Sequence, residues 1–257
     1  MHTIRSKGLL AAAALLLVAS GARADSCRSE SFESAKFVVC SFDLAKDDLR
    51  MFWRDGESAP YRTFPALAEA LESKGLTLTF AMNGGMYGDD FSPTGLYVEE
   101  GRELTSINTR KVSGSPGQIP NFYKKPNGVF YVAGKTAGVM TTDAWLASPP
   151  RADYATQSGP MLLIDGKIHP AFIEGSTDLK PRDGVGVSGP TKVHFAITVG
   201  VVNFHDFARF FRDKLGCANA LFLDGGWAPG LFAPELDRAD APGHGGYGPI
   251  IGVVKAP

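Results

Sequence analysis

Short apolar runs, each cut off by turn-forming residues, follow one another along most of the chain and limit the folds it can adopt. Runs of this length bounded by Gly, Pro, Asn or Asp are typical of strands. Two of the turns, Glu99-Glu100-Gly101 and Ile164-Asp165-Gly166-Lys167, indicate hairpins because glycine accepts positive φ. Strands are expected over residues 36–42, 49–53, 76–82, 95–99, 128–132, 154–158, 161–164, 184–188, 191–198, 220–223 and 247–254, the first two forming a pair.

Two helices are predicted between these strands. Residues 63–74 space their apolar side chains along one helical face, and Gly75 provides a natural stop. Asn203 is expected to cap a second amphipathic helix that ends at Gly216. No internal repeat or linker stands out, which favours one domain.

The N-terminus has the pattern of an exported protein. Two basic residues precede an apolar run over residues 8–20, and small residues follow at Ala22 and Ala24. This pattern predicts a signal peptide over residues 1–24 and a mature domain over 25–257, in the periplasm or secreted. The apolar run has 13 residues, whereas a membrane-spanning helix needs about 20, so no permanent membrane anchor is expected.

Charge and cysteine content narrow the class of protein further. The formal net charge is −1 and falls to −4 once a leader with three basic residues is removed. Without a cluster of Lys and Arg, nucleic acid is not an expected partner. Cys27 and Cys40 bracket a short segment, so a disulfide is expected between them in an oxidising compartment, with Cys217 as a buried free thiol.

Four glycine-containing segments lie at or beside predicted strands: Ala81-Met82-Asn83-Gly84-Gly85-Met86-Tyr87, Thr156-Gln157-Ser158-Gly159-Pro160-Met161, Arg182-Asp183-Gly184-Val185-Gly186 and Leu221-Phe222-Leu223-Asp224-Gly225-Gly226. Their content and order resemble the phosphodiester glycosidase family, which includes the lysosomal uncovering enzyme and many exported bacterial proteins. Pro126-Asn127-Gly128-Val129-Phe130 and the helix that starts at Asn203 fit the same order. The resemblance covers nearly the whole mature chain.

This resemblance implies an α/β (α+β) fold in a single domain, with a mixed, mainly antiparallel sheet flanked by helices. It also implies hydrolysis of the glycosidic bond in sugar-1-phosphodiesters, with an N-acetylglucosamine-type or cell-envelope glycan as substrate. The chain departs from the animal enzyme at Trp227-Ala228-Pro229, where small polar residues are more usual. The identity of the sugar therefore stays open, as does the oligomeric state.

Three side chains are the catalytic candidates. Arg182 offers a bidentate guanidinium that matches phosphate oxygens, although a surface ion pair is the alternative. Asp224 follows a buried strand and is expected to act as nucleophile, general base or cation ligand. Glu99 is the best second carboxylate, because paired acids usually flank a glycosidic bond.

Amide, hydroxyl and glycine residues at the strand ends are the candidates for binding substrate, because backbone without a Cβ can approach a ligand closely. Ordinary turns that satisfy their own backbone are the alternative. The candidates are Asn83, Gly84, Gly85, Gln157, Ser158, Gly159, Gly225 and Gly226.

Aromatic and histidine side chains near these segments are less decisive. Trp227 and Tyr87 could stack on a sugar ring or pack in the core. His169 and His244 lie in loops that could rim a pocket, but no histidine has metal-ligand spacing. The sequence requires no cofactor, although a divalent cation, Ca²⁺ or Mg²⁺, is compatible with the carboxylates.

Two other functions fit the same features. A non-catalytic envelope protein could hold phosphoglycans in the same pocket without turnover. A metal-assisted phosphodiesterase would break the P–O bond rather than the C–O bond.

Overall fold

A computed structural model describes residues 26–56, 59–115 and 117–256 of the protein. The signal peptide predicted over residues 1–24 lies outside these described residues.

The strands of the described residues form three sheets, in which every strand pairing is antiparallel. The seven-stranded sheet has the order β1 (Cys27–Phe32), β2 (Ala35–Asp43), β13 (Lys192–Val199), β12 (Arg182–Val187), β14 (Asn219–Gly225), β10 (Met161–Ile164) and β11 (Lys167–Ile168). One five-stranded sheet has the order β16 (Arg238–Ala239), β15 (Leu231–Ala233), β4 (Thr77–Asn83), β17 (Ile250–Lys255) and β3 (Asp48–Phe52). The other has the order β6 (Arg102–Thr105), β5 (Tyr97–Glu99), β9 (Tyr154–Ser158), β7 (Gly128–Ala133) and β8 (Thr136–Thr141).

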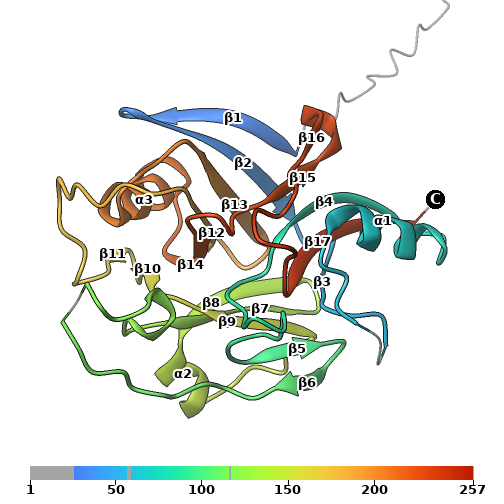
Figure 1. Ribbon diagram of the computed structural model, residues 1–257, viewed down its shortest axis with the longest axis horizontal. Coiled ribbons are helices and arrows are strands. Elements are labelled where there is room, and N and C mark those ends of the chain that lie inside the picture. Colours follow the sequence, from blue (N-terminus) through green and yellow to red (C-terminus); the bar gives the residue numbers. More distant parts are fainter. Residues whose placement is uncertain (1–25, 57–58, 116, 257) are drawn as a thin grey trace, which may run out of the picture.

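The helices of the described residues are few and lie outside the sheets. They are α1 (Phe64–Glu72), α2 (Thr142–Ala147) and α3 (Phe204–Arg209), which continues as a π-helix over Phe210–Lys214. Short 3₁₀ turns span Asn121–Tyr123 and Pro234–Leu236. Figure 1 shows α1 and α3 on opposite flanks of the molecule and α2 beside the sheet of β7 to β9. None of the helices in the described residues is long and apolar enough to cross a bilayer.

The predicted fold class is confirmed: of the described residues, 43% lie in strands and 14% in helices. The predicted strands over residues 154–158 and 161–164 coincide with β9 and β10. Both hairpin turns form as expected, with positive φ at Glu100 and Gly101 in one and at Asp165 and Gly166 in the other. Local patterns of two to eight residues therefore predict the elements well.

One predicted pairing is wrong. The strands over residues 36–42 and 49–53 exist as β2 and β3, but they belong to different sheets: β2 pairs with β1 and β13, whereas β3 pairs with β17. The true neighbour β1 is an edge strand of mostly polar residues, so it carries no apolar signal.

The three sheets meet in one main core at the ring of Phe195 in β13. This ring lies 5.0 Å from Phe80 of β4 and 5.9 Å from Phe130 of β7, and all three rings are fully buried. Phe42 of β2 adds a fourth ring, 4.8 Å from Phe80. Each sheet thus buries one face against the other two, which fixes where their strand ends converge.

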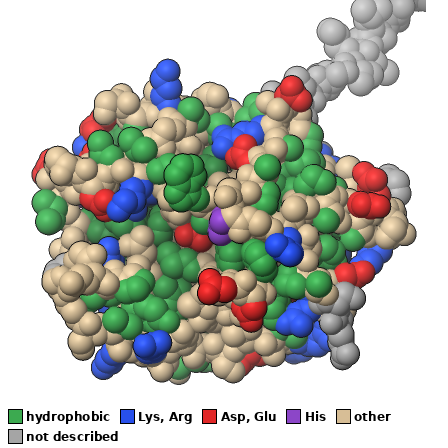
Figure 2. All heavy atoms as spheres, in the orientation of Figure 1, with side chains coloured by type: hydrophobic (Ala, Val, Ile, Leu, Met, Phe, Trp, Pro, Cys, Tyr) green, Lys and Arg blue, Asp and Glu red, His purple; other side chains and the backbone are tan. Residues whose placement is uncertain are grey.

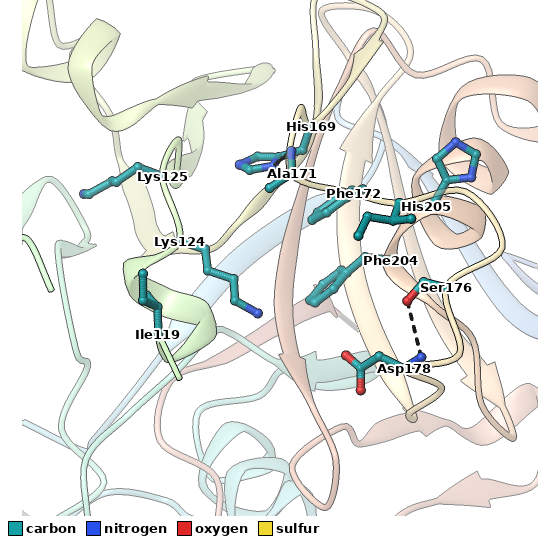
Figure 3. A pocket seen from close by; sticks show the side chains of 11 residues that line it. Ile119, Lys124, Lys125, His169, Ala171, Phe172, Ser176, Asp178, Phe204 and His205 are labelled. Atoms are coloured by element: carbon teal, nitrogen blue, oxygen red, sulfur yellow. Dashed lines mark hydrogen bonds between the residues drawn. The ribbon is translucent and has the colours of Figure 1, made fainter. Parts of the chain in front are cut away.

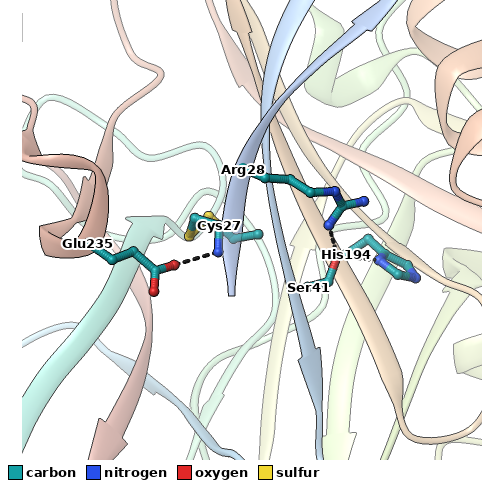
Figure 4. The surroundings of a disulfide bond; sticks show 6 residues. Cys27, Arg28, Ser41, His194 and Glu235 are labelled. Carbon is teal, nitrogen blue, oxygen red and sulfur yellow. Dashed lines mark hydrogen bonds between the residues drawn. A yellow bond between two sulfur atoms is a disulfide. The ribbon is translucent and has the colours of Figure 1, made fainter. Parts of the chain in front are cut away.

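The disulfide between Cys27 and Cys40 is confirmed, and Cys217 is free and buried. The two cysteines are directly opposite each other in the β1–β2 ladder, and Figure 4 shows the surroundings of the bridge. The Cys27 backbone N–H also donates to the Glu235 carboxylate, which ties the edge strand to the turn between β15 and β16.

We predict that replacing both Cys27 and Cys40 by alanine lowers the free energy of unfolding by roughly 2–4 kcal/mol, because the bridge closes a short loop in the unfolded chain. Urea unfolding at neutral pH measures this loss. Wild-type protein unfolded in the presence of reductant should lose a similar amount, which separates the bridge from the packing of the cysteine side chains. Unchanged stability in both cases would contradict the prediction.

Candidate active site

The ends of three strands and the beginning of a fourth converge on one spot. The Thr156 hydroxyl in β9 donates to the Gly84 carbonyl just after β4, at 2.6 Å, and the Ser158 hydroxyl donates to the Leu223 carbonyl in β14, at 2.8 Å. Asp183 in β12 pairs across the ladder with Asp224 in β14. The four glycine-containing segments of the sequence are therefore brought together.

A β-bulge at Leu223 decides where Asp224 points. Gly184 is opposite Phe222 and Asp183 is opposite Asp224, so Leu223 is an extra residue without a partner in β12. A bulge of this kind re-aims the side chains that follow it. It places Asp224 on the same face as Asp183, and the Ser158 hydroxyl satisfies the carbonyl of the bulged residue.

Asp183 and Asp224 form a closely linked pair of carboxylates. Asp183 Oδ1 accepts a hydrogen bond from the Asp224 backbone N–H at 2.7 Å, and Asp224 Oδ1 accepts from the Gly225 N–H at 2.8 Å. Asn83 Oδ1 accepts from the Gly230 N–H at 3.0 Å. Asp183 Oδ2 and Asn83 Nδ2 are buried without a hydrogen bond of normal geometry.

The two carboxylates have unusual acidities. Asp183 is fully buried, and this burial, followed by the charge of Asp224, raises its pKa well above the ordinary range; the Asp224 N–H and the Asn83 side chain offset part of the rise. Asp224 is half-buried, and the protein around its carboxyl group keeps most water away from it. This desolvation raises the pKa of Asp224 to about 7. Burial thus favours the protonated form of Asp183 and raises the pKa of Asp224 to about 7. Neighbouring carboxyl groups with raised pKa values are typical of acid–base sites.

A cleft of about 570 Å³ is lined by Gly225, the residue after Asp224, and by Trp227, Ala228, Gly243 and His244. Trp227 is 86% exposed, which excludes core packing and leaves its ring free to stack on a ligand. The Tyr87 hydroxyl donates to the Gly246 carbonyl at 2.8 Å and lies 2.5 Å from His244 Nε2. Burial and the nearby charge of Asp224 both raise the pKa of Tyr87, so it stays a neutral phenol.

The charges on the surface are mixed. Figure 2 shows basic and acidic side chains interspersed with hydrophobic ones on the face that it presents, without a gathering of one sign.

The structure places Arg182 differently from the expected phosphate ligand. Its side chain is 1% exposed, its Nε donates to the Val202 carbonyl at 2.9 Å, and its Nη2 donates to the Asp178 carbonyl at 3.2 Å. The guanidinium lies 3.5 Å from the centre of the Phe204 ring, on the opposite strand face from Asp183. Burial lowers the pKa of Arg182 to about 10, so it remains charged at neutral pH.

Glu99 is not brought to the carboxylate pair. It lies in a separate pocket with Trp53, Arg54 and Arg102, and it accepts a hydrogen bond from the Tyr97 hydroxyl at 2.8 Å. Burial raises the pKa of Glu99. The carboxyl group that the structure brings beside Asp224 is that of Asp183 rather than that of Glu99.

Sequence reasoning missed Asp183 as a site residue. Its position next to Arg182, in a segment already singled out, was the available signal. Arg182 and Asp183 are neighbours in a strand, so their side chains lie on opposite faces. Which of the two shares a face with Asp224 depends on the bulge in the partner strand, which the sequence does not reveal.

The predicted binding residues mostly hold the scaffold. The Gln157 carboxamide accepts from the Leu96 and Asn108 N–H groups and donates to the Asn108 carbonyl and the Thr142 hydroxyl, so its bonding capacity is used. Gly84 and Gly159 are needed because a Cβ would lie 3.1 Å from Pro249 and 2.4 Å from the Asn127 Cβ. Gly85 has a φ of 120°, while Gly225 lines the cleft and Gly226 follows it in the turn.

A metal ion stays a prediction. Among the described residues, no group of three or more His, Cys, Asp or Glu side chains is arranged to hold one.

The chain is similar to several known proteins. A family model described as phosphodiester glycosidase matches residues 77–249. YigE, an uncharacterized protein of Escherichia coli strain K12, is 35% identical over 177 residues, which are 69% of this chain and 66% of that protein. The match therefore spans just under two thirds of the relative's length.

Solved structures share the fold at low sequence identity. The catalytic domain of zebrafish N-acetylglucosamine-1-phosphodiester alpha-N-acetylglucosaminidase, auto-inhibited by its pro-peptide, matches with a TM-score of 0.60 and 13% identity, over 88% of this chain and 81% of that chain. A putative exported protein from Burkholderia pseudomallei matches with a TM-score of 0.54 and 12% identity, over 85% of this chain and 74% of that chain.

We predict that Asp224→Asn stabilises the protein at pH 8 but not at pH 4.5. Because the folded-state pKa is raised to about 7 from 3.8, the carboxyl favours the folded state below pH 4 and loses this contribution as the pH rises through 7. Thermal unfolding should show a Tm gain of roughly 2–6 °C at pH 8. The exposed control Asp237→Asn should show no such dependence on pH, and an equal effect of Asp224→Asn at both pH values would contradict the prediction.

We also predict that Ser158→Ala lowers the free energy of unfolding by about 1–3 kcal/mol, because it leaves the buried Leu223 carbonyl unpaired. Urea unfolding measures the loss. The control is Ser73→Ala, which removes an exposed hydroxyl bound to the Ala70 carbonyl and should cost less than about 0.5 kcal/mol. Equal losses in the two variants would exclude a special role for the bulge contact.

Proposed function

The chain belongs to the phosphodiester glycosidase family, and from this premise we propose that it hydrolyses the glycosidic bond of sugar-1-phosphodiesters. The proposed substrate carries an N-acetylglucosamine-type sugar or a cell-envelope glycan. One observation carries the proposal: Asp224, whose pKa burial raises to about 7, directly precedes Gly225 in a cleft whose wall also holds the exposed ring of Trp227.

The proposed hydrolysis does not need a strong acid. The oxygen of water ends on the anomeric carbon, the bond from that carbon to the phosphate oxygen breaks, and its electron pair stays on the phosphate. The leaving group is a phosphate, which is a stable anion. Its protonation therefore contributes less to the rate than protonation of the leaving group does in ordinary glycosides. Asp224 in its ionised form acts in one of two ways. It stabilises the positive charge that develops at the anomeric carbon, or it accepts a proton from the attacking water.

Asp183 acts through Asp224 in this scheme. Its side chain is fully buried, and it holds the Asp224 backbone through the hydrogen bond from the Asp224 N–H to Asp183 Oδ1. We therefore regard Asp183 as a positioning residue. Trp227 provides a flat surface for the apolar face of the sugar ring.

We further propose that the protein works outside the cytoplasm. The disulfide between Cys27 and Cys40 supports this location, because such bridges persist in oxidising compartments. The predicted leader supports it independently.

The test is release of sugar from N-acetylglucosamine-1-phosphodiesters by the purified protein, with and without chelator. Asp224→Asn should lower kcat/KM by about 10²–10⁴-fold, whereas Asp237→Asn, at an exposed turn residue, should leave it unchanged. In the wild type, kcat/KM should rise as the pH passes through about 7, because ionised Asp224 is the active form.

Three outcomes would redirect the proposal. Binding of a phosphoglycan without turnover would favour a binding protein. Hydrolysis in ¹⁸O-labelled water that puts the label into the phosphate would favour a phosphodiesterase, whereas label in the sugar supports the glycosidase. Loss of activity with chelator would add a divalent cation to the site.

A further inference from the structure

The phosphate of the proposed substrate needs a positively charged partner, and the cations considered so far do not supply one. Arg182 is held in hydrogen bonds to backbone carbonyls. Figure 3 shows a pocket beside α3 that contains Lys124 and Lys125. Its Phe204 ring lies 3.5 Å from the Arg182 guanidinium, on the strand face opposite to that of the carboxylate pair. The lysines of this pocket therefore lie away from a phosphate bound beside that pair.

His244 is the residue of the cleft that can carry a positive charge. Of the five residues that line the cleft, Gly225, Ala228 and Gly243 have no polar side chain, and Trp227 offers an uncharged indole N–H. An imidazole gains a proton readily near neutral pH. The His244 side chain is exposed in the cleft, so a ligand can reach it.

The hydrogen bonds of Tyr87 determine which nitrogen of the imidazole is free. The Tyr87 hydroxyl contacts the Gly246 carbonyl at 2.8 Å and His244 Nε2 at 2.5 Å. A carbonyl can only accept, so the single phenol proton is donated to Gly246. His244 Nε2 must then carry a hydrogen, which it donates to the phenol oxygen. Nδ1 makes no hydrogen bond to any described residue and is the nitrogen that a ligand would meet.

The loop that carries His244 is fixed at two carbonyl groups. Arg62 Nη2 donates to the Gly245 carbonyl at 2.7 Å, and the Tyr87 hydroxyl donates to that of Gly246. Gly245 has a φ of 93°, and a Cβ on Gly246 would lie 2.8 Å from the Arg62 Cβ. Glycine at both positions therefore allows the tight packing that holds the imidazole in place.

The imidazole is also the outer member of a stack of rings. His244 stacks on Tyr87 with 5.7 Å between ring centres, and Tyr87 stacks on Phe91 with 5.9 Å. Phe91 has a positive φ of 63°, and its carbonyl accepts from Nε1 of the buried Trp53 at 2.8 Å. Non-glycine residues with such a backbone are concentrated at functional sites. The stack fixes the plane of the imidazole.

Tyr87 connects His244 to the carboxylate pair. Burial, followed by the charge of Asp224 and, more weakly, that of Asp183, raises the pKa of Tyr87. Since charge interactions fall off with distance, Asp224 lies near the hydroxyl that accepts from His244. One ligand in the cleft can therefore present its anomeric carbon to Asp224 and the phosphate, one bond away, to His244.

We propose that His244 binds the phosphate of the substrate, with Nδ1–H donating to a phosphate oxygen while Nε2–H stays bonded to Tyr87. With both nitrogens protonated the ring is a cation, which matches the negative charge of a phosphodiester. The second proton comes from solvent, and the bound anion favours its uptake. As the glycosidic bond breaks, negative charge grows on the phosphate and this hydrogen bond strengthens. The assignment rests on the proposed function and adds His244 to its site, with Tyr87 as a positioning residue.

Two substitutions at one position separate the two ring nitrogens. The amide nitrogen of Asn can take the place of Nδ1, whereas that of Gln takes the place of Nε2. The probe is the methyl diester of N-acetylglucosamine-1-phosphate, titrated calorimetrically into protein that also carries Asp224→Asn to prevent turnover. His244→Gln should weaken binding by about tenfold or more, and His244→Asn by less than about threefold. Lys124→Met, in the pocket of Figure 3, is the control and should leave binding unchanged.

The imidazole can also be observed directly through its ¹⁵N chemical shifts. In the free protein the neutral ring should carry its hydrogen on Nε2, and saturation with the methyl diester should protonate Nδ1 as well. In Tyr87→Phe the neutral ring should become a mixture of the two tautomers, because the acceptor for Nε2–H is lost. A neutral ring with its hydrogen on Nδ1 in the free wild type would overturn the assignment.

The inference and the proposed function fail in different ways. Binding that depends on His244 as described, but without turnover in the wild type, would contradict the proposed function and leave this site standing. Equal effects of His244→Asn and His244→Gln on binding and on KM would overturn the inference even if the protein turns the diester over. Loss of binding in Lys124→Met, or no binding of the diester at all, would overturn it as well.

Discussion

The ring of Phe195 packs against Phe80 and Phe130, and through them one strand of each sheet is held against the other two. These contacts lie deep in the core, far along the chain from one another. Because β4, β9, β12 and β14 are all strands of these three sheets, their relative placement follows from this packing. The meeting of Asn83, Ser158, Asp183 and Asp224 at one spot is therefore a consequence of core packing before it is a matter of chemistry.

The site contains buried polar groups that would destabilise the core if they lacked hydrogen-bond partners. The bulge at Leu223 exposes one carbonyl to the interior, and the Ser158 hydroxyl satisfies it. The bulge also turns Asp224 onto the face of Asp183, where burial raises the pKa of both carboxyl groups, that of Asp224 to about 7. A regular strand would have pointed Asp224 toward Phe222 and the α3 face instead.

Much of the fold could be read from the sequence because its signals are local. Residues 154–158, 161–164 and both hairpin turns were predictable from alternation and from glycine, and the disulfide from cysteine spacing. The partners of β2 and β3 were not, since pairing depends on the whole fold. Asp224 and the strand-end segments could be identified from the sequence. The place of Asp183 in the site could not, because it depends on the bulge. The hydrogen bonds of Arg182 to the Val202 and Asp178 carbonyls depend on tertiary contacts and were not predictable either.

Cys217 bears on how the chain acquires its native bridge. Burial raises the pKa of this thiol to about 12, so in the folded protein almost none of it is the thiolate that attacks disulfides. Exchange with the Cys27–Cys40 bridge is therefore confined to the time before Cys217 is covered by Phe211 and its neighbours in the α3 core. The odd cysteine is a hazard for oxidative folding only while the chain is still open, and completed folding removes it from thiol chemistry.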